Sequence, residues 1–177
     1  LKLLNWKGEF LSAKDGEEVL RLASAEDFEF AGAGEEGTLT TDSSWGQRHI
    51  DLILNLDLVD RKAIEEADFR EAVDCVNSVG GIIVPQLLEA LGVKSVIELY
   101  TNPDGNFPHN PEPLPENLTE ISGLVTREKA DLGFVVDPDV DRLAIICEDG
   151  SMFGEEYTLV SVSDFVLRNT PGNTVSN

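Results

Sequence analysis

The sequence predicts an α/β fold, a three-layer α/β/α domain with a small mixed, mostly parallel sheet. From residue 69 to residue 168, short apolar runs typical of strands alternate with segments of helical periodicity, in the order β-α-β-α-β-β-α. The third of these apolar runs ends abruptly in three aspartates, and open α/β sheets bind their ligands at the carboxyl ends of strands. These two observations predict both the fold class and the place of the candidate site.

The composition allows a hydrophobic core and limits the partners. The chain has 177 residues, of which 41% are hydrophobic, enough for one domain and additional segments. With 34 acidic and 13 basic residues its net charge is −21, which argues against nucleic acid and anionic membranes, because both would repel it. A phosphorylated small substrate stays possible, since a metal ion and a few cations can reverse the local potential.

Other features concern the compartment and the extent of the chain. The sequence has no apolar run of ~18 residues, the length that a membrane-spanning helix needs, and no signal peptide is visible. Cys75 and Cys147 lie in apolar strand-like runs, so we expect buried thiols and a cytoplasmic location. The chain begins at Leu1 instead of a methionine and stops at Asn177 just after a strand-like start, which predicts a piece of a longer protein.

The first 44 residues predict few regular elements. Residues 1–5 are apolar enough for a short strand, and residues 15–23 suit a helix with an acidic first turn. Residues 31–37 are rich in Gly and Glu and predict a flexible loop.

Two helices are predicted next, and we interpret them as a connection between two domains. Over residues 45–59 apolar side chains recur at intervals of three and four positions, which predicts a helix. Asp60 is a suitable N-cap for a second, short helix over residues 61–67.

A strand, helix and strand follow. The apolar residues 72–76 predict a strand, residues 82–91 a helix that ends at Gly92, and residues 94–100 the next strand. The glycine turn at residues 77–81 lacks the spacing of a dinucleotide-binding motif, so a tight strand-to-helix corner is the favoured interpretation.

Residues 101–117 predict a long loop that contains five of the eight prolines. Proline at this density favours one extended path, and long ordered loops in compact domains tend to be functional. His109 in this loop is a candidate ligand or acid/base group, although a structural hydrogen-bonding role is the favoured interpretation.

The last part of the domain contains two strands between two helices. Residues 118–129 predict a helix with Asn117 as its N-cap, followed by strands over residues 132–136 and 143–147. A final helix is predicted over residues 154–168, and Arg168 in its last turn suits the negative end of the helix dipole.

The aspartates that follow the strand over residues 132–136 are the strongest chemical signal. Asp137, Asp139 and Asp141 repel one another if they converge, which favours either a raised pKa or a bound hard divalent cation. Magnesium keeps room for phosphate oxygens, and Arg142 is shaped for bidentate phosphate contact.

Three other interpretations of this loop stay open. It could be a solvated acidic turn, or an EF-hand loop with Glu148 at position 12, although Arg142 stands where that loop needs glycine. In an aspartate-nucleophile phosphatase, Asp137 would be the nucleophile and Asp139 the acid/base group.

Four segments together resemble one family, the α-D-phosphohexomutases. The run from Asp137 to Arg142 resembles their magnesium loop, which usually has glycine where Pro138 stands. Residues 74–77 with Gly80 and Gly81 resemble the first strand and glycine turn of the family's second domain. Residues 104–108 resemble a loop signature of that domain, and residues 154–156 resemble the segment that follows the magnesium loop.

The resemblance implies a fragment of a four-domain enzyme. It implies that residues 1–44 are the end of domain 1, residues 45–68 a helical connection, residues 69–168 domain 2 and residues 169–177 the start of domain 3. The serine that carries a phosphoryl group in this family would lie upstream of Leu1, so we expect the isolated chain to be inactive.

The resemblance also implies the reaction and the site residues. A phosphoserine would exchange its phosphoryl group with a hexose 1- or 6-phosphate through a bisphosphate intermediate. Asp137, Asp139 and Asp141 would hold Mg²⁺, and Arg142 would contact the phosphate region. Lys2 resembles in position a lysine that transfers protons in the family. An aspartyl phosphatase that uses Asp137 is the alternative function, and a non-enzymatic cation-binding module is the third.

Overall fold

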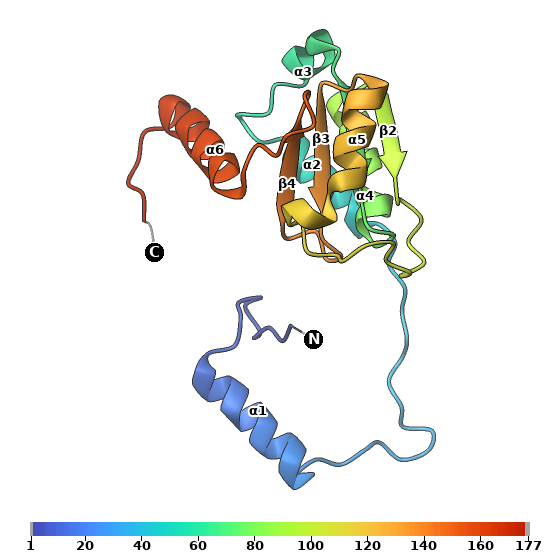
Figure 1. Ribbon diagram of the computed structural model, residues 1–177. Helices are drawn as coiled ribbons and strands as arrows, with labels where there is room; N and C mark the ends of the chain where they lie inside the picture. The colour runs from blue at the N-terminus through green and yellow to red at the C-terminus, as the bar shows by residue number, and fades with distance from the viewer. Residues whose placement is uncertain (1, 176–177) are drawn as a thin grey trace. The chain divides into compact units, whose positions relative to one another are not determined.

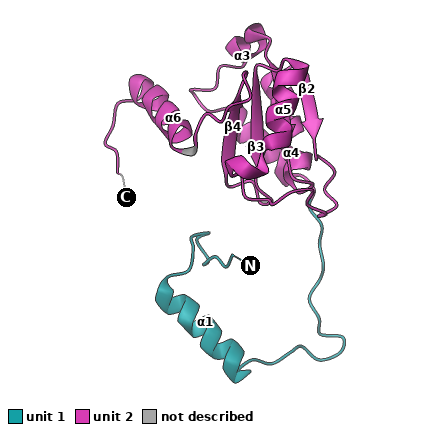
Figure 2. Cartoon of the chain, in the orientation of Figure 1, with its two compact units in different colours: residues 1–42 teal, residues 43–177 magenta. Residues whose placement is uncertain are grey.

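The computed structural model describes residues 2–175 (Figure 1). It divides into two compact units, residues 1–42 and residues 43–177 (Figure 2). Within the described part of the chain, no helix is both long enough and apolar enough to cross a membrane.

The first unit is built on one helix, α1, Ala13–Ala25. The side chain of Ser12 accepts a hydrogen bond from the backbone N–H of Asp15 and so caps the helix, which confirms the helix predicted there. The strand predicted over residues 1–5 is wrong for residues 2–5, and Leu1 lies outside the described residues. The side chain of Asn5 accepts hydrogen bonds from the N–H groups of Lys7 and Glu9, which turns the chain and leaves an isolated bridge between Leu4 and Phe10.

The second unit contains a sheet with the strand order β2-β1-β3-β4. The strands are β1, Arg70–Asp74; β2, Ser95–Leu99; β3, Leu132–Val136; and β4, Leu143–Cys147. β1 lies parallel to both β2 and β3, whereas β4 is antiparallel to β3. The mixed, mostly parallel sheet predicted from the sequence is therefore confirmed.

Helices cover both faces of this sheet, which confirms the three-layer α/β/α fold (Figure 1). α5, Thr119–Glu128, packs on one face over the buried side chains of Ala72, Val135 and Ile146. α4, Gly80–Leu91, packs on the other face over Val73 and Val136. Successive strand residues alternate between the two cores, as the pleat requires.

The remaining helices lie around this three-layer body. They are α2, Trp45–Leu54, which packs beside α4; α3, Arg61–Ala67; a 3₁₀ turn, η1, Pro115–Asn117; and α6, Glu155–Asn169. The predicted N-cap Asp60 accepts a hydrogen bond from the N–H of Ala63, and Arg168 lies in the last turn of α6. Both cysteines are free thiols, Cys75 buried and Cys147 half-buried.

Three predicted boundaries are wrong for local reasons. The helix predicted to reach residue 59 ends at Leu54, and the residues after it form separate turns. The first strand lies two residues earlier than predicted because Val76 and Asn77 have φ values of 47° and 53°, which no extended strand allows. Asn117 is not the N-cap of α5, since it lies in η1 and its side chain donates to the carbonyl of Glu112.

Candidate metal centre

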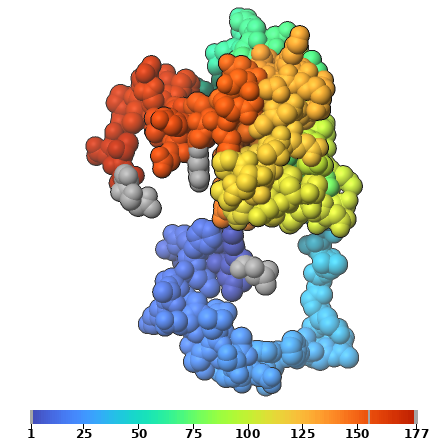
Figure 3. Space-filling view, viewed as in Figure 1, coloured from blue at the N-terminus to red at the C-terminus, as the bar shows by residue number. Residues whose placement is uncertain are grey.

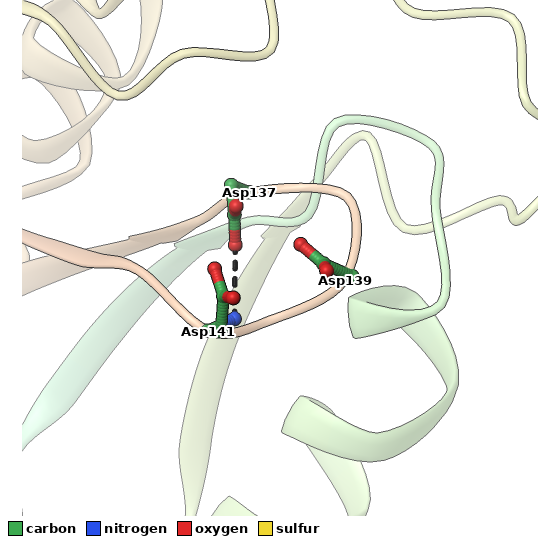
Figure 4. Close-up of side chains that lie close together, drawn as sticks. All are labelled: Asp137, Asp139 and Asp141. Carbon is green, nitrogen blue, oxygen red and sulfur yellow. Dashed lines mark hydrogen bonds between the residues drawn. The ribbon is translucent and has the colours of Figure 1, made fainter. Parts of the chain in front are cut away.

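Three aspartates converge in the loop that connects β3 to β4. One carboxylate oxygen each from Asp137, Asp139 and Asp141 lies within 4.8 Å of the others (Figure 4). Asp137 is buried directly after the last residue of β3, whereas Asp139 and Asp141 are exposed. The spacing i, i+2, i+4 therefore brings these side chains together at the carboxyl end of a parallel strand.

The loop is closed by its own first aspartate. Oδ1 of Asp137 accepts hydrogen bonds from the N–H groups of Asp141, at 3.0 Å, and Arg142, at 3.1 Å. Val140 has a φ of 62°, an uncommon conformation for a β-branched residue, and its side chain packs against the core beneath α4. Packing of this apolar side chain offsets the backbone strain and holds the loop in one shape.

The electrostatics of the loop favour a cation. Burial raises the pKa of the Asp137 carboxyl, and the N–H of Arg142 opposes this shift. The charges of Asp141 and Asp139 raise the same pKa further. Three close carboxylate oxygens are the hard donor set that suits a divalent cation such as Mg²⁺, so the residues present fit such an ion.

A serine from another turn also holds residues 137–142, which we call the metal loop after the family loop that they resemble. The hydroxyl of Ser78, in the turn after β1, donates a hydrogen bond of 2.8 Å to the carbonyl oxygen of Pro138. The sequence predicted only a tight corner at this turn and missed Ser78. Its contact partner lies 60 residues away, and no local pattern indicates such a pair.

We expect Ser78→Ala to loosen the metal loop. Loss of this half-buried hydrogen bond should weaken Mn²⁺ binding to the 177-residue chain about fivefold, the equivalent of ~1 kcal/mol. Isothermal titration calorimetry measures the change. Ser161→Ala on the exposed face of α6 is the matched control, and equal affinities for both variants would contradict the role of Ser78.

The guanidinium of Arg142 contacts a carboxylate of the proline-rich loop, residues 101–117. It forms an ion pair with Glu112, and both side chains are about half exposed. Together with Asp141, the pair lines a cavity of about 430 Å³ that extends toward β4 and α6. The sequence indicated Arg142 but not its partner, because an acidic residue between prolines carries no distinctive signal.

His109 fastens the same loop to the sheet. Its Nε2 lies 3.0 Å from Oδ2 of Asp74, at the end of β1, and its Nδ1 donates to the carbonyl of Asn110. Asp74 is buried, and its Oδ1 accepts a hydrogen bond from the N–H of Val76. These contacts give His109 the structural role that the sequence analysis favoured.

Lys2, the predicted acid/base residue, belongs to the first unit, whereas the three aspartates belong to the second. Its role stays a prediction.

Comparison with known proteins places this geometry in a family. Residues 47–150, more than half of the chain, match the family described as phosphoglucomutase/phosphomannomutase, alpha/beta/alpha domain II. The chain belongs to the phosphoglucomutase/phosphomannomutase family. The matched residues include all four strands and the metal loop, so the resemblance read from the sequence is confirmed.

Individual members of this family resemble the chain over different lengths. A phosphomannomutase/phosphoglucomutase of Pseudomonas aeruginosa is 45% identical over 102 residues, 56% of this chain and 22% of that protein. A phosphoglucomutase/phosphomannomutase of Thermococcus kodakarensis is 36% identical over 173 residues, 97% of this chain and 37% of that protein. The crystal structure of a family protein from Burkholderia thailandensis superposes with a TM-score of 0.72 at 26% identity, over 92% of this chain and 33% of that one. The chain thus spans roughly a fifth to two fifths of its relatives.

Proposed function

We propose that this chain is the metal-loop segment of a magnesium-dependent phosphohexomutase. The whole protein would interconvert hexose 1-phosphates and 6-phosphates through a phosphoserine and a bisphosphate intermediate. The observation that carries the proposal is the convergence of three aspartate oxygens within 4.8 Å, inside the segment that matches the family. Relatives named phosphomannomutase/phosphoglucomutase support hexose phosphates as substrates.

The proposal includes the domain assignment made from the sequence. Residues 1–44 would end the first domain, residues 45–68 would connect it to the second, residues 69–168 would form the second and residues 169–177 would begin the third. The division of the structure near residue 42 supports the first of these boundaries. Without the serine loop, we expect the chain by itself to show no conversion of glucose 1-phosphate to glucose 6-phosphate.

Each site residue has a separate task in this proposal. The three aspartates would hold the ion. Asp137 is oriented by the hydrogen bonds that it accepts from the backbone N–H groups of Asp141 and Arg142. When bound, Mg²⁺ supplies positive charge that neutralises and orients phosphoryl oxygens, which is the main requirement of phosphoryl transfer. Arg142 would bind substrate phosphate through its guanidinium, and Lys2 would carry a proton to and from the sugar hydroxyl.

Paramagnetic NMR tests the metal loop directly. We expect substoichiometric Mn²⁺ to broaden the amide signals of residues 137–142 selectively, and Asp139→Asn to abolish this broadening. Asp57→Asn, the same charge change at an exposed position outside the cluster, should leave it intact. Diffuse broadening over many acidic surfaces, unchanged by Asp139→Asn, would mean that the loop binds no ion specifically and would overturn the proposal.

An aspartate-nucleophile phosphatase is the alternative, with the phosphoryl group carried by Asp137. This residue is the buried member of the cluster, and one of its oxygens is occupied by two backbone N–H groups. Family membership favours the mutase. A beryllofluoride adduct on Asp137, detected by ¹⁹F NMR, would favour the phosphatase, whereas phosphate recovered on a serine of the whole protein would favour the mutase.

A further inference from the structure

We propose that Glu112 is a positioning residue for Arg142. It holds the guanidinium on the proline-rich loop, so that this group does not compete with a divalent cation for the three aspartates. The inference rests on the proposed function, because it takes Asp137, Asp139 and Asp141 as the metal ligands.

Arg142 follows one set of acidic residues in the sequence, and its guanidinium contacts another acidic residue. It follows Asp141 directly, so its long side chain starts beside a cluster of three carboxylates whose oxygens lie within 4.8 Å of one another. A planar guanidinium with five donors binds carboxylates well, and it would occupy the same oxygens that a cation needs. In the structure the guanidinium contacts a fourth carboxylate, that of Glu112, 30 residues away in sequence.

Glu112 is held in place by its own backbone. Its N–H donates to the side chain of Asn110, and its carbonyl accepts from the side chain of Asn117 and from the N–H of Leu114. The loop that carries it lies at the end of the sheet where the parallel strands finish, and it forms a continuous surface of the second unit (Figures 1 and 3). Its other fastening point is the contact between His109 and Asp74.

These contacts of the loop determine how stable the ion pair between Glu112 and Arg142 is. An exposed pair between two free side chains contributes little, because both lose conformational freedom when they meet. Here prolines on both sides and the backbone hydrogen bonds restrict the backbone that carries the carboxylate before the pair forms, so less freedom is lost. A carboxylate on a backbone restricted in this way competes with the aspartates for Arg142.

Glu112 could also help a cation simply through its negative charge, and a double-mutant cycle separates the two effects. Mn²⁺ affinity is measured by calorimetry on the 177-residue chain for the wild type, Glu112→Gln, Arg142→Met and the double variant. We expect Glu112→Gln to weaken binding about three- to fivefold when Arg142 is present, because the released guanidinium then occupies the aspartates. In the Arg142→Met background the same change should alter the affinity less than about 1.5-fold.

The NMR signals of Arg142 provide a second readout. The Nη–H signals of Arg142 should shift in Glu112→Gln, because the guanidinium exchanges the Glu112 carboxylate for those of the aspartates, and Glu112→Asp should restore part of the wild-type shift. Glu116→Gln, an exposed acid of the same loop, is the matched control for charge and should change neither readout.

The outcomes distinguish this inference from the proposed function. Equal weakening by Glu112→Gln in both backgrounds, or no weakening in either, overturns the role of Glu112 while the metal site stands. Wild-type affinity no higher than that of Asp139→Asn overturns both, because the loop then binds no cation.

Discussion

Replacing Gly81 with alanine is expected to destabilise the second unit by about 3 kcal/mol or more. A Cβ atom at this position, in the first turn of α4, would lie 2.0 Å from the carbonyl oxygen of Thr101 and 2.5 Å from its carbonyl carbon. Both are backbone atoms, so no side-chain rotation relieves the clash. The start of α4 and the start of the proline-rich loop would have to separate, and the loop would lose its packing against α4.

Urea denaturation followed by circular dichroism at 222 nm measures this loss. Gly123→Ala in α5 is a matched control, because a Cβ there meets no atom within 4 Å. In the interior of a helix this control should be neutral or stabilise by up to ~1 kcal/mol. Unfolding of Gly81→Ala at the same urea concentration as the wild type would show that the two segments are not packed this closely.

Glu71→Gln is expected to stabilise the protein above neutral pH, by about 2 kcal/mol. Glu71 lies in β1 between β2 and β3, and its side chain is buried. Within residues 2–175, its Oε2 has no hydrogen-bond partner. Burial raises the pKa of this carboxyl from 4.5 to about 7, and the charge of Asp131 adds to the shift.

The sign of the pH dependence follows from these pKa values. Between about pH 4.5 and pH 7 the folded protein keeps a proton that the unfolded chain has released. The free energy of unfolding contributed by Glu71 therefore falls as the pH rises through this window, and the full cost of a buried charge is present above it. Glutamine has no proton to lose, so the gain from Glu71→Gln should be small near pH 4.5 and largest near pH 8.

Urea titrations of the wild type and Glu71→Gln at pH 5 and pH 8 measure this difference. Glu89→Gln, on the exposed side of α4, controls for the change in net charge and should shift neither midpoint appreciably. A constant difference between wild type and Glu71→Gln at both pH values would contradict the raised pKa.

Much of the fold is determined locally and could be predicted from the sequence. The strands Leu132–Val136 and Leu143–Cys147 were predicted to the residue, because each is a short apolar run between polar or turn-forming residues. Asp60 at the start of α3 and Gly92 after α4 follow from hydrogen bonding at helix ends and from the left-handed backbone, with φ of 99°, that glycine adopts easily. The convergence of Asp137, Asp139 and Asp141 is also local, since a five-residue turn brings them together.

The tertiary structure alone decided which distant groups support this loop. Ser78 and Pro138 are 60 residues apart, Asp74 and His109 are 35 apart, and Glu112 and Arg142 are 30 apart. None of these pairs follows from periodicity or motif spacing. They meet because the strand order β2-β1-β3-β4 places the carboxyl ends of the parallel strands β2, β1 and β3 side by side, which brings together the loops that follow them. Local patterns thus account for the acidic loop and the strand before it, whereas packing of the sheet explains what holds Arg142 and the loop in place.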